Sequence, residues 1–491
     1  MISSTQNALT YEELVIQNMQ LRHELDQLKR LVFGSRHERF VPAIAEEQLA
    51  LGLEVPSIPI ITSTPGLTQT IAYTRSKTND TSEKVSTGRM KLPADLPREQ
   101  VIIEPVEDVT GLKKIGEEIT EELERIPGKL FVKQYVRPKY AKPNGQGVLI
   151  GELPTRTIDK GIAGPGLLAQ IIIDKYTDHL PIHRQVQRFE REGIKLSSST
   201  LTDWISATCT LLDPLYEVLR KEVLAQDYLQ VDETPIKVLD KNKKGTTHRG
   251  FHWVYRSPVK KIVMFDYQEG RGREGPQACL RHFKGYLQTD GYAVYEDFGR
   301  KPGVTLLGCM AHARRKFDEA KSNDATRAEY VLTEMQKLYA LERHSKIQAL
   351  SAEQIIEIRQ THSVPVLLAL KEWMLDNYKS VLPQSTIGQA IHYSLQRWDK
   401  LMAYTTDGRL EIDNNLVENA IRPVAIGRKN YLFAGSHNGA RRAAMLYSFL
   451  GTCKINNVNP FEWLKDILTT IQTHPVNKLQ NLLPVNWNSK M

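Results

Sequence analysis

Cysteine is scarce in this chain. Cys209, Cys279, Cys309 and Cys453 are the only four among 491 residues, and no two of them form a C-x-x-C pair. A disulfide framework or a cysteine zinc finger is therefore not expected, whereas a reducing compartment is. No apolar run approaches the roughly 18 residues that indicate a membrane span, and the N-terminus lacks the basic and then apolar pattern of a signal peptide. The sequence predicts a soluble cytoplasmic protein without a membrane partner.

What the chain does have is length and positive charge. Its 491 residues exceed what one hydrophobic core normally serves, so several domains are expected. Lysine and arginine number 65 against 57 aspartates and glutamates, and the net charge is +8. Because the basic residues recur in local clusters, a polyanionic partner is favoured.

Residues 10–40 begin with apolar residues spaced alternately by four and three, from Leu14 to Val32, with Asn18 among them. This spacing is typical of a dimeric coiled coil in which one polar residue fixes the register. A helix packed on its own chain is the alternative. Residues 41–90 are rich in Ser, Thr, Pro and Gly and indicate a linker.

Residues 91–150 contain short extended runs and predict a small β module. Its final strand interleaves tyrosines with Arg137, Lys139 and Lys142. Such a strand either follows a phosphate backbone or is an edge strand that lysines protect from pairing.

Residues 164–222 are predicted to be mostly helical. The run PIHRQVQRFEREG, the turn IKLSS and the run STLTDWISATCTLL give two helices, the second with a Ser/Thr N-cap. This arrangement is typical of a helix-turn-helix that reads a DNA major groove, and an ordinary helical hairpin is the alternative. We expect a helical DNA-binding region here.

A change of period at Tyr228 predicts strands. The runs YLQVDETPIKVL, GFHWVYRS, KIVMFDY and GYLQTDGYAVY give four strands, with the short helix QACLRHF before the fourth and VTLLGCMAH after it. This order indicates a mixed α/β domain. A helical insertion follows at about 319–410, and residues 436–485 form a C-terminal helical segment.

Three carboxylates stand out in this α/β region. Asp232 lies within the first apolar strand, where a charge is costly unless it is paired or bound to metal. Asp290 ends the fourth strand, and Glu418 lies on a helix that begins near Asn415. Together they would form an open oxygen-ligand site suited to Mg²⁺ or Mn²⁺. Separately, each has a structural explanation: a buried ion pair, a turn and a helix surface.

Two other acids compete with these candidates. Asp413 is the alternative to Glu418, although Asp followed by Asn-Asn is also a natural N-cap or turn. Glu233 is weaker, because strand alternation points it away from Asp232.

Several motifs occur in a fixed order: VDET at 231–234, TDGY at 289–292, CMAHARR at 309–315, DNN followed by Glu at 413–418, and GRKNYLFAGS at 427–436. Together with FGSRHERF near the N-terminus and PFEWLKDIL near the C-terminus, this set closely resembles the transposases of the insertion sequence 66 family. The resemblance covers nearly the whole chain.

The resemblance implies an α/β multidomain protein with an RNase H-like catalytic domain at 223–435. Its D-D-E triad would be Asp232, Asp290 and Glu418, which would hold two Mg²⁺ or Mn²⁺ ions. It also places basic side chains near the DNA phosphates: His312, Arg314, Arg315, Arg422, Arg428 and Lys429. For His312, a purely structural role is the alternative.

The function implied is a DNA transposase that cuts at transposon ends and transfers the freed 3′-OH into target DNA. A nuclease of the same fold without strand transfer, or a catalytically inactive DNA-binding regulator, are the alternatives. The resemblance further implies bacterial, nucleoid-associated location, a homo-oligomer formed through the coiled coil and on DNA, and small accessory proteins.

One part of the chain departs from the family pattern. Where relatives carry the paired cysteines of a zinc-binding domain, this chain has VEDVTGLKKIG at 106–116 and KYAKPNG at 139–145. We therefore predict that the module at 91–150 lacks zinc.

Overall fold

In the computed structural model, the described residues are 155–159, 161–240 and 246–488, together with short pieces between 128 and 150. The chain divides into two compact units, Met1–Lys129 and Leu130–Met491. The predicted coiled coil and linker lie outside the described residues. Of the small β module, the described part is an antiparallel pair of short strands, β1 (Lys139–Ala141) and β2 (Val148–Ile150).

The region before the large sheet is helical, as predicted, and holds one helix, α2 (Pro165–Tyr176), ahead of the predicted pair. The pair consists of α3 (Ile182–Arg191) and α4 (Ser198–Leu224). The predicted N-cap is confirmed, because the Ser197 hydroxyl accepts a hydrogen bond from the Thr200 N–H at 3.0 Å. DNA binding by this region stays a prediction.

The sheet has five strands in the order β5-β4-β3-β6-β7. Its antiparallel part consists of β3 (Tyr228–Leu239), β4 (Thr247–Ser257) and β5 (Ile262–Gln268). The short helix α5 (Glu274–Cys279) leads to β6 (Gly285–Gln288), which runs parallel to β3, and β7 (Val304–Leu307) runs parallel to β6. The predicted mixed sheet is confirmed.

The fourth strand is shorter than predicted. It ends at Gln288, and a 3₁₀ turn, η3 (Ala293–Tyr295), replaces its expected second half. The strand stops because Gly291 adopts a φ of 88° and Asp290 Oδ1 accepts a hydrogen bond from the Tyr292 N–H at 2.9 Å. Asp290 therefore lies in a turn just beyond β6 and not in the strand. A second 3₁₀ turn, η4 (Phe298–Arg300), precedes β7.

The predicted insertion is helical. It comprises α6 (Met310–Ala320), α7 (Ala325–Ile347), α8 (Ala352–Ile358), the π-helical turn η5 (Arg359–Ser363), α9 (Val364–Tyr378), α10 (Thr386–Gln396), α11 (Trp398–Met402) and η6 (Ala403–Thr406). The chain then returns to the sheet and ends with α12 (Asn415–Tyr431), α13 (His437–Ile455), α14 (Pro460–Thr470) and η7 (Val476–Leu482).

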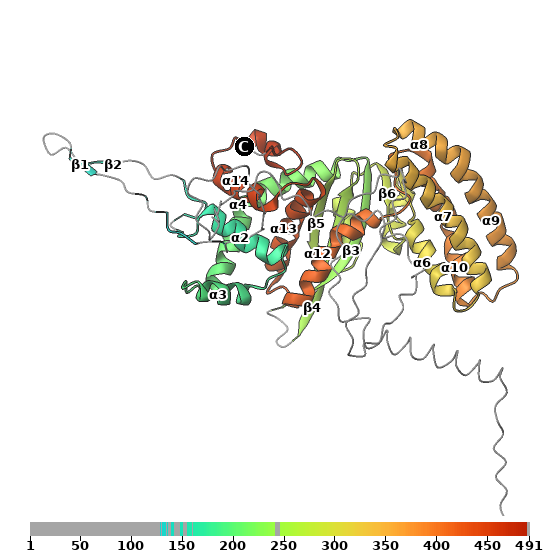
Figure 1. Ribbon diagram of the computed structural model, residues 1–491, viewed down its shortest axis with the longest axis horizontal. Helices are drawn as coiled ribbons and strands as arrows, with labels where there is room; N and C mark the ends of the chain where they lie inside the picture. Colours follow the sequence, from blue (N-terminus) through green and yellow to red (C-terminus); the bar gives the residue numbers. More distant parts are fainter. Residues whose placement is uncertain are drawn as a thin grey trace, which may run out of the picture. The chain divides into compact units, whose positions relative to one another are not determined.

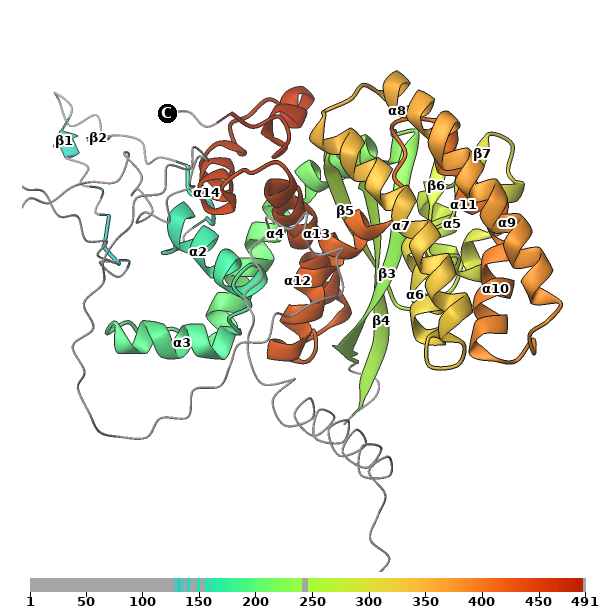
Figure 2. The same ribbon diagram turned by 45° about the vertical axis from the view of Figure 1, so that its right-hand side comes forward.

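The second unit has two hydrophobic cores. One surrounds the sheet and includes Trp253 and Trp463. The other fills the insertion and reaches the sheet at Tyr228 and Leu307. Figures 1 and 2 show α7, α9 and α10 gathered beyond the β6 side of the sheet, and α2, α13 and α14 on the β5 side. Among the helices that the structure describes, none has the length and apolar character that a membrane crossing needs.

Gly285 gives a test of the sheet geometry. It opens β6 with a φ of 122°, and a Cβ there would lie 2.0 Å from the Asp227 carbonyl oxygen. Gly285→Ala should lower the free energy of unfolding by about 2 kcal/mol or more. The alanine would have to adopt a strained positive φ, and its Cβ would also clash with the Asp227 carbonyl oxygen. Urea unfolding measures this loss. Gly166→Ala in α2 is the matched control, since nothing lies within 4 Å of its Cβ position and alanine favours a helix. An equal loss of unfolding free energy in both variants would show that the backbone conformation and close contact at Gly285 do not cause the destabilisation.

Candidate active site

Asp232 on β3 and Glu418 on α12 line one open pocket of about 280 Å³. The other residues that line it are Glu233, His312, Arg315, Ile421 and Arg422. The structure thus brings two of the three predicted carboxylates together with three of the six predicted DNA-contacting side chains.

Asp290 does not line this pocket, but its charge acts on the carboxylates that do. Burial raises the pKa of Asp232 to about 8, and the charges of Asp290, Glu233 and Glu418 add to the rise. The Glu233 N–H, which donates to Asp232 Oδ1 at 2.7 Å, opposes it. The three predicted carboxylates therefore belong to one electrostatic cluster.

The carboxylates of this cluster are spread apart and do not form a closed ion site. Within the described parts of the chain, no three His, Cys, Asp or Glu side chains converge closely enough to hold an ion by themselves. Mg²⁺ is usually held by one or two carboxylates together with substrate phosphates and water, which suits carboxylates spread around a pocket. The raised pKa of Asp232 fits the same chemistry, because a divalent cation offsets the repulsion among these acids. The donor set fits a cation that binds together with a phosphate group.

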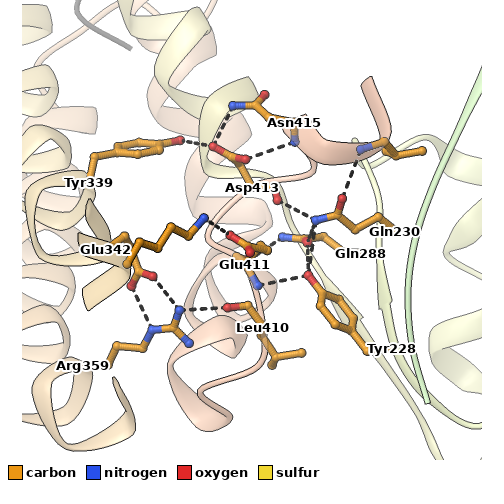
Figure 3. A network of polar contacts seen from close by, with 12 residues as sticks. Tyr228, Gln230, Gln288, Tyr339, Glu342, Arg359, Leu410, Glu411, Asp413 and Asn415 are labelled. Carbon is orange, nitrogen blue, oxygen red and sulfur yellow. Dashed lines mark hydrogen bonds and ion pairs between the residues drawn. The ribbon is translucent and has the colours of Figure 1, made fainter. Parts of the chain in front are cut away.

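A buried polar group connects the strands that lead to the carboxylates (Figure 3). Gln230 on β3 and Gln288 on β6 are register partners, and each precedes an aspartate of the cluster by two residues. Gln230 Nε2 donates to Gln288 Oε1 at 2.9 Å, and the Tyr228 hydroxyl donates to the same oxygen at 2.6 Å. All three side chains are fully buried.

The same group fixes the start of α12. Its N-cap residue, Asn414, provides no side-chain cap. Gln230 Oε1 instead accepts a hydrogen bond from the Val417 N–H at 3.2 Å, and Gln230 Nε2 donates to the Asp413 carbonyl oxygen at 2.9 Å. Because the first N–H groups of a helix have no partner within it, a strand side chain here supplies the missing cap. Glu418 follows Val417 directly, so one glutamine links the position of Asp232 to that of Glu418.

Asp413, the alternative to Glu418, is buried and does not line the pocket. Its carboxylate accepts hydrogen bonds from the Tyr339 hydroxyl at 3.0 Å and from the Asn415 N–H at 3.1 Å. Burial raises the pKa of Asp413 to about 6, and these hydrogen bonds oppose the rise. Asp413 therefore forms the turn before α12, and the geometry favours Glu418 as the site acid.

Glu233 was expected to point away from Asp232, yet it lines the same pocket. Its side chain is only 3% exposed and pairs with Arg271 Nη2 at 2.6 Å. The Tyr295 hydroxyl also donates to Glu233 Oε2 at 3.3 Å. This paired carboxylate differs from Asp232, which has no cation partner of this kind within the described contacts. No sequence signal distinguished Arg271 as its partner.

The basic side chains fall into two groups. His312 Nε2 lies 3.7 Å from Glu418 Oε1. Burial lowers the pKa of His312, the charge of Glu418 opposes this and that of Arg315 adds to it. Burial therefore favours the neutral form of the imidazole. Arg315 and Arg422 also line the pocket and are exposed.

Arg314, Arg428 and Lys429 do not line the pocket. Arg428 Nη1 donates to Thr234 Oγ1 at 2.9 Å and to the Pro235 carbonyl oxygen at 2.7 Å, which anchors α12 on β3. Arg314 lies close to Tyr339 in the insertion: burial raises the pKa of that tyrosine, and the charge of Arg314 opposes the rise. Lys429 is exposed on the last turn of α12. DNA contact by these three residues stays a prediction.

Comparison with known families identifies the chain. A model described as Transposase IS66 family matches residues 160–442, which hold every candidate site residue. The chain belongs to the IS66 transposase family. Three further models match outside this stretch: the IS66 C-terminal element at 448–485, Transposase C of IS166 homeodomain at 20–101, and the zinc-finger binding domain of transposase IS66 at 108–141.

Relatives of full length are found in Sinorhizobium fredii. The uncharacterized protein y4jD is 33% identical over 97% of this chain and 96% of its own length. The uncharacterized protein y4hP is 32% identical over 95% of this chain and 88% of its own length. No solved structure matches the chain. Membership of the IS66 transposase family supports a transposase role with DNA as the partner.

The family comparison corrects the expectation about zinc. The match of the zinc-finger binding domain at 108–141 contradicts the prediction that this region lacks zinc. That prediction rested on the absence of paired cysteines alone.

Asp232 predicts a pH dependence of stability in the metal-free protein. Its pKa is about 8 in the folded state, against about 3.9 in an unfolded chain. Between these values the folded state binds more protons, so the free energy of unfolding falls as pH rises from about 4 to about 8. The Asp232→Asn variant should lack this fall and should melt roughly 10 °C above wild type at pH 8, because a pKa raised from about 3.9 to about 8 corresponds to about 5 kcal/mol.

Thermal unfolding in EDTA at pH 5 and at pH 8 measures this effect, with the wild type and Asp232→Asn converging at the lower pH. Asp203→Asn, an exposed acid on α4, is the control and should follow wild type. Parallel curves for wild type and Asp232→Asn at both pH values would exclude the raised pKa.

Proposed function

We propose that this IS66 family member is a DDE transposase, which cuts at transposon ends and transfers the 3′-OH into target DNA. The observation that carries the proposal is the electrostatic cluster at one open pocket. Asp232 and Glu418 line it, Asp290 acts on it through its charge, and Arg315 and Arg422 lie exposed beside these acids.

The sheet is proposed to be RNase H-like. Support comes from the strand order β5-β4-β3-β6-β7, with three antiparallel strands followed by two parallel ones. Support also comes from the placement of the acids: Asp232 on the central strand β3, and Asp290 just after the neighbouring strand β6. The insertion then returns the chain to β3 through α12, which carries Glu418.

The proposed reaction is phosphodiester transfer in two steps. Water attacks the phosphorus at the transposon end, so a new P–O bond forms while the bond to the 3′ oxygen breaks and leaves a 3′-OH. That 3′-OH then attacks a phosphodiester of the target, and one P–O bond again replaces another. No covalent enzyme intermediate is needed.

The side chains have distinct parts in this proposal. Asp232 would hold two divalent ions, with Asp290 and Glu418 completing one each, and Asp232 must first lose its proton. Bound there, Mg²⁺ or Mn²⁺ activates the attacking oxygen and stabilises the leaving one. Arg315 and Arg422 bind phosphate oxygens through charge-assisted hydrogen bonds. The imidazole of His312 faces Glu418, with its Nε2 3.7 Å from Glu418 Oε1, and would help to orient that carboxylate.

Further DNA contacts are proposed for α2–α4. Arg184 and Arg191 on α3 and Lys195 in the following turn are exposed. The first two turns of α4 also expose Ser198 and Thr202, which are small enough to approach base edges. Oligomer formation through residues 10–40, and the participation of accessory proteins, remain part of the same proposal.

Glu418→Gln tests the assignment of the third carboxylate. The substrate is labelled DNA that carries the transposon end (element-end DNA). With Mg²⁺, the wild-type chain should cleave this DNA and join it to target DNA. In the variant the rates of cleavage and joining should both fall by about 10³-fold or more, because an amide cannot replace the charge of the carboxylate. DNA binding, measured by gel shift, should remain. Glu372→Gln is the matched control, an exposed glutamate on α9.

The outcomes separate the rival functions. Cleavage without joined products indicates a nuclease. A wild-type chain that binds DNA but neither cleaves nor joins it indicates an inactive regulator. An active Glu418→Gln variant rejects Glu418 as the site acid, and Asp413→Asn then becomes the next variant to measure.

Arg422→Ala tests phosphate contact beside the carboxylates. Its affinity for element-end DNA should fall, and the slope of log affinity against log salt should decrease by about 1, because one phosphate contact is lost. Arg343→Ala, which removes an exposed arginine on α7, is the control. The prediction fails if the two variants have the same salt dependence.

A further inference from the structure

We infer that the helical insertion positions the proposed triad, with α7 and η5 holding the turn before Glu418 and α10 holding the turn that contains Asp290. The inference rests on the proposed function and adds positioning residues to it. None of these residues lines the pocket itself.

Arg359 is the first anchor (Figure 3). It opens the π-helical turn η5 and is only 2% exposed. Its Nε and Nη2 donate to the two carboxylate oxygens of Glu342 at 2.8 and 2.6 Å. Nη1 donates to the carbonyl oxygens of Tyr404 and Asp407, each at 2.8 Å, and Nη2 also donates to that of Leu410 at 2.8 Å. An arginine has five N–H donors, so this one uses its full capacity on Glu342 and on the segment that leads to Asp413.

This buried ion pair is not explained by stability alone. Burying two charges costs about as much as their attraction returns, and apolar residues of similar volume are often equally stabilising. What the pair specifies is geometry, because three carbonyl groups spread over residues 404–410 must meet one planar guanidinium. The π-helical turn that presents Arg359 is also a feature found frequently at functional sites.

Tyr339 continues this anchor from α7. Its hydroxyl donates to Asp413 Oδ2 at 3.0 Å, and Lys346 on the same helix contacts Glu411 Oε2 at 2.7 Å. Asp413 in turn accepts hydrogen bonds from the backbone and the side chain of Asn415, the first residue of α12. An unbroken series of contacts therefore runs from α7 to the first turn of the helix that carries Glu418.

The second anchor comes from α10. The Tyr393 hydroxyl donates to the Asp290 carbonyl oxygen at 3.0 Å. Arg397, just after this helix, stacks on Tyr393 with its guanidinium carbon 4.3 Å from the ring centroid. A Cβ at Gly291 would lie 2.7 Å from Arg397 Nε, so the turn after Asp290 fits closely against that arginine.

Asp232 lies on the sheet, whereas the turns that bear Asp290 and precede Glu418 are both held from the insertion. Because no three such acids in the described residues converge on an ion by themselves, the separation of these turns decides how well two ions and a phosphate are shared. Tyr339, Arg359 and Tyr393 therefore act through the residues that touch the substrate.

The test uses Tyr339→Phe and Tyr393→Phe, each of which removes one hydroxyl and keeps the ring. Mn²⁺ affinity is measured by electron paramagnetic resonance on the full chain bound to precleaved element-end DNA, so the readout does not depend on turnover. Each variant should bind Mn²⁺ about 10-fold more weakly, as partners of metal-binding carboxylates typically do when removed. The Mg²⁺ concentration for half-maximal cleavage should rise in parallel, and saturating Mg²⁺ should restore most of the rate.

Tyr378→Phe is the matched control. Its hydroxyl lies 3.4 Å from His392 Nδ1, and that contact is exposed on the same insertion. It should leave Mn²⁺ affinity unchanged. Arg359→Lys, which keeps the charge but cannot make five hydrogen bonds, should weaken Mn²⁺ binding in the same direction as Tyr339→Phe.

The failures are distinguishable. Wild-type Mn²⁺ affinity in both Tyr339→Phe and Tyr393→Phe overturns the inference, as does an equal loss in Tyr378→Phe. A wild type that binds Mn²⁺ but neither cuts nor joins DNA overturns the proposed function, while a shift of Mn²⁺ affinity in the variants still supports the positioning. A wild type that binds no Mn²⁺ overturns both.

Discussion

The hydrogen bond between Gln230 and Gln288 is the interaction on which the candidate site depends. Both side chains are fully buried, and an unpaired amide in such surroundings would cost about 1–3 kcal/mol. Their four polar atoms are instead shared among β3, β6 and the segment before α12. Buried polar groups that are fully paired hold one arrangement and disfavour others. Here that arrangement fixes the relative positions of β3, which bears Asp232, of β6, which leads to the turn at Asp290, and of α12, which bears Glu418.

Much of the fold was predictable because its signals are local. Alternating apolar residues predicted β3, β4 and β5, and helical spacing predicted the insertion, since both patterns depend on neighbours a few residues apart. The length of β6 was not predictable from its apolar run, because the turn at Asp290 depends on the backbone of Gly291. The choice between Asp413 and Glu418 depends on Tyr339, which is 74 residues from Asp413 in sequence.

The roles of the basic residues were likewise not predictable from the sequence, because they depend on contacts with distant parts of the chain. In the sequence, Arg422 and Arg428 lie on one helix and carry the same charge, yet one is exposed beside the carboxylates and the other is tied to β3. A guanidinium can bind a phosphate group or hold several carbonyl groups, because its planar donors serve both uses. Arg359 is the clearest clamp and had no distinguishing motif around it.

The cap that Gln230 provides to Val417 also has a consequence for synthesis on the ribosome. The two residues are 187 positions apart, and a ribosome adds about 5–20 residues per second. Glu418 follows Asp290 by 128 positions, so for roughly 6–26 s the chain carries both aspartates without the helix that completes the carboxylate set. A chain that ends before α12 cannot assemble all three acids, so under the proposed function this order of synthesis delays the cutting of DNA until the protein is nearly complete.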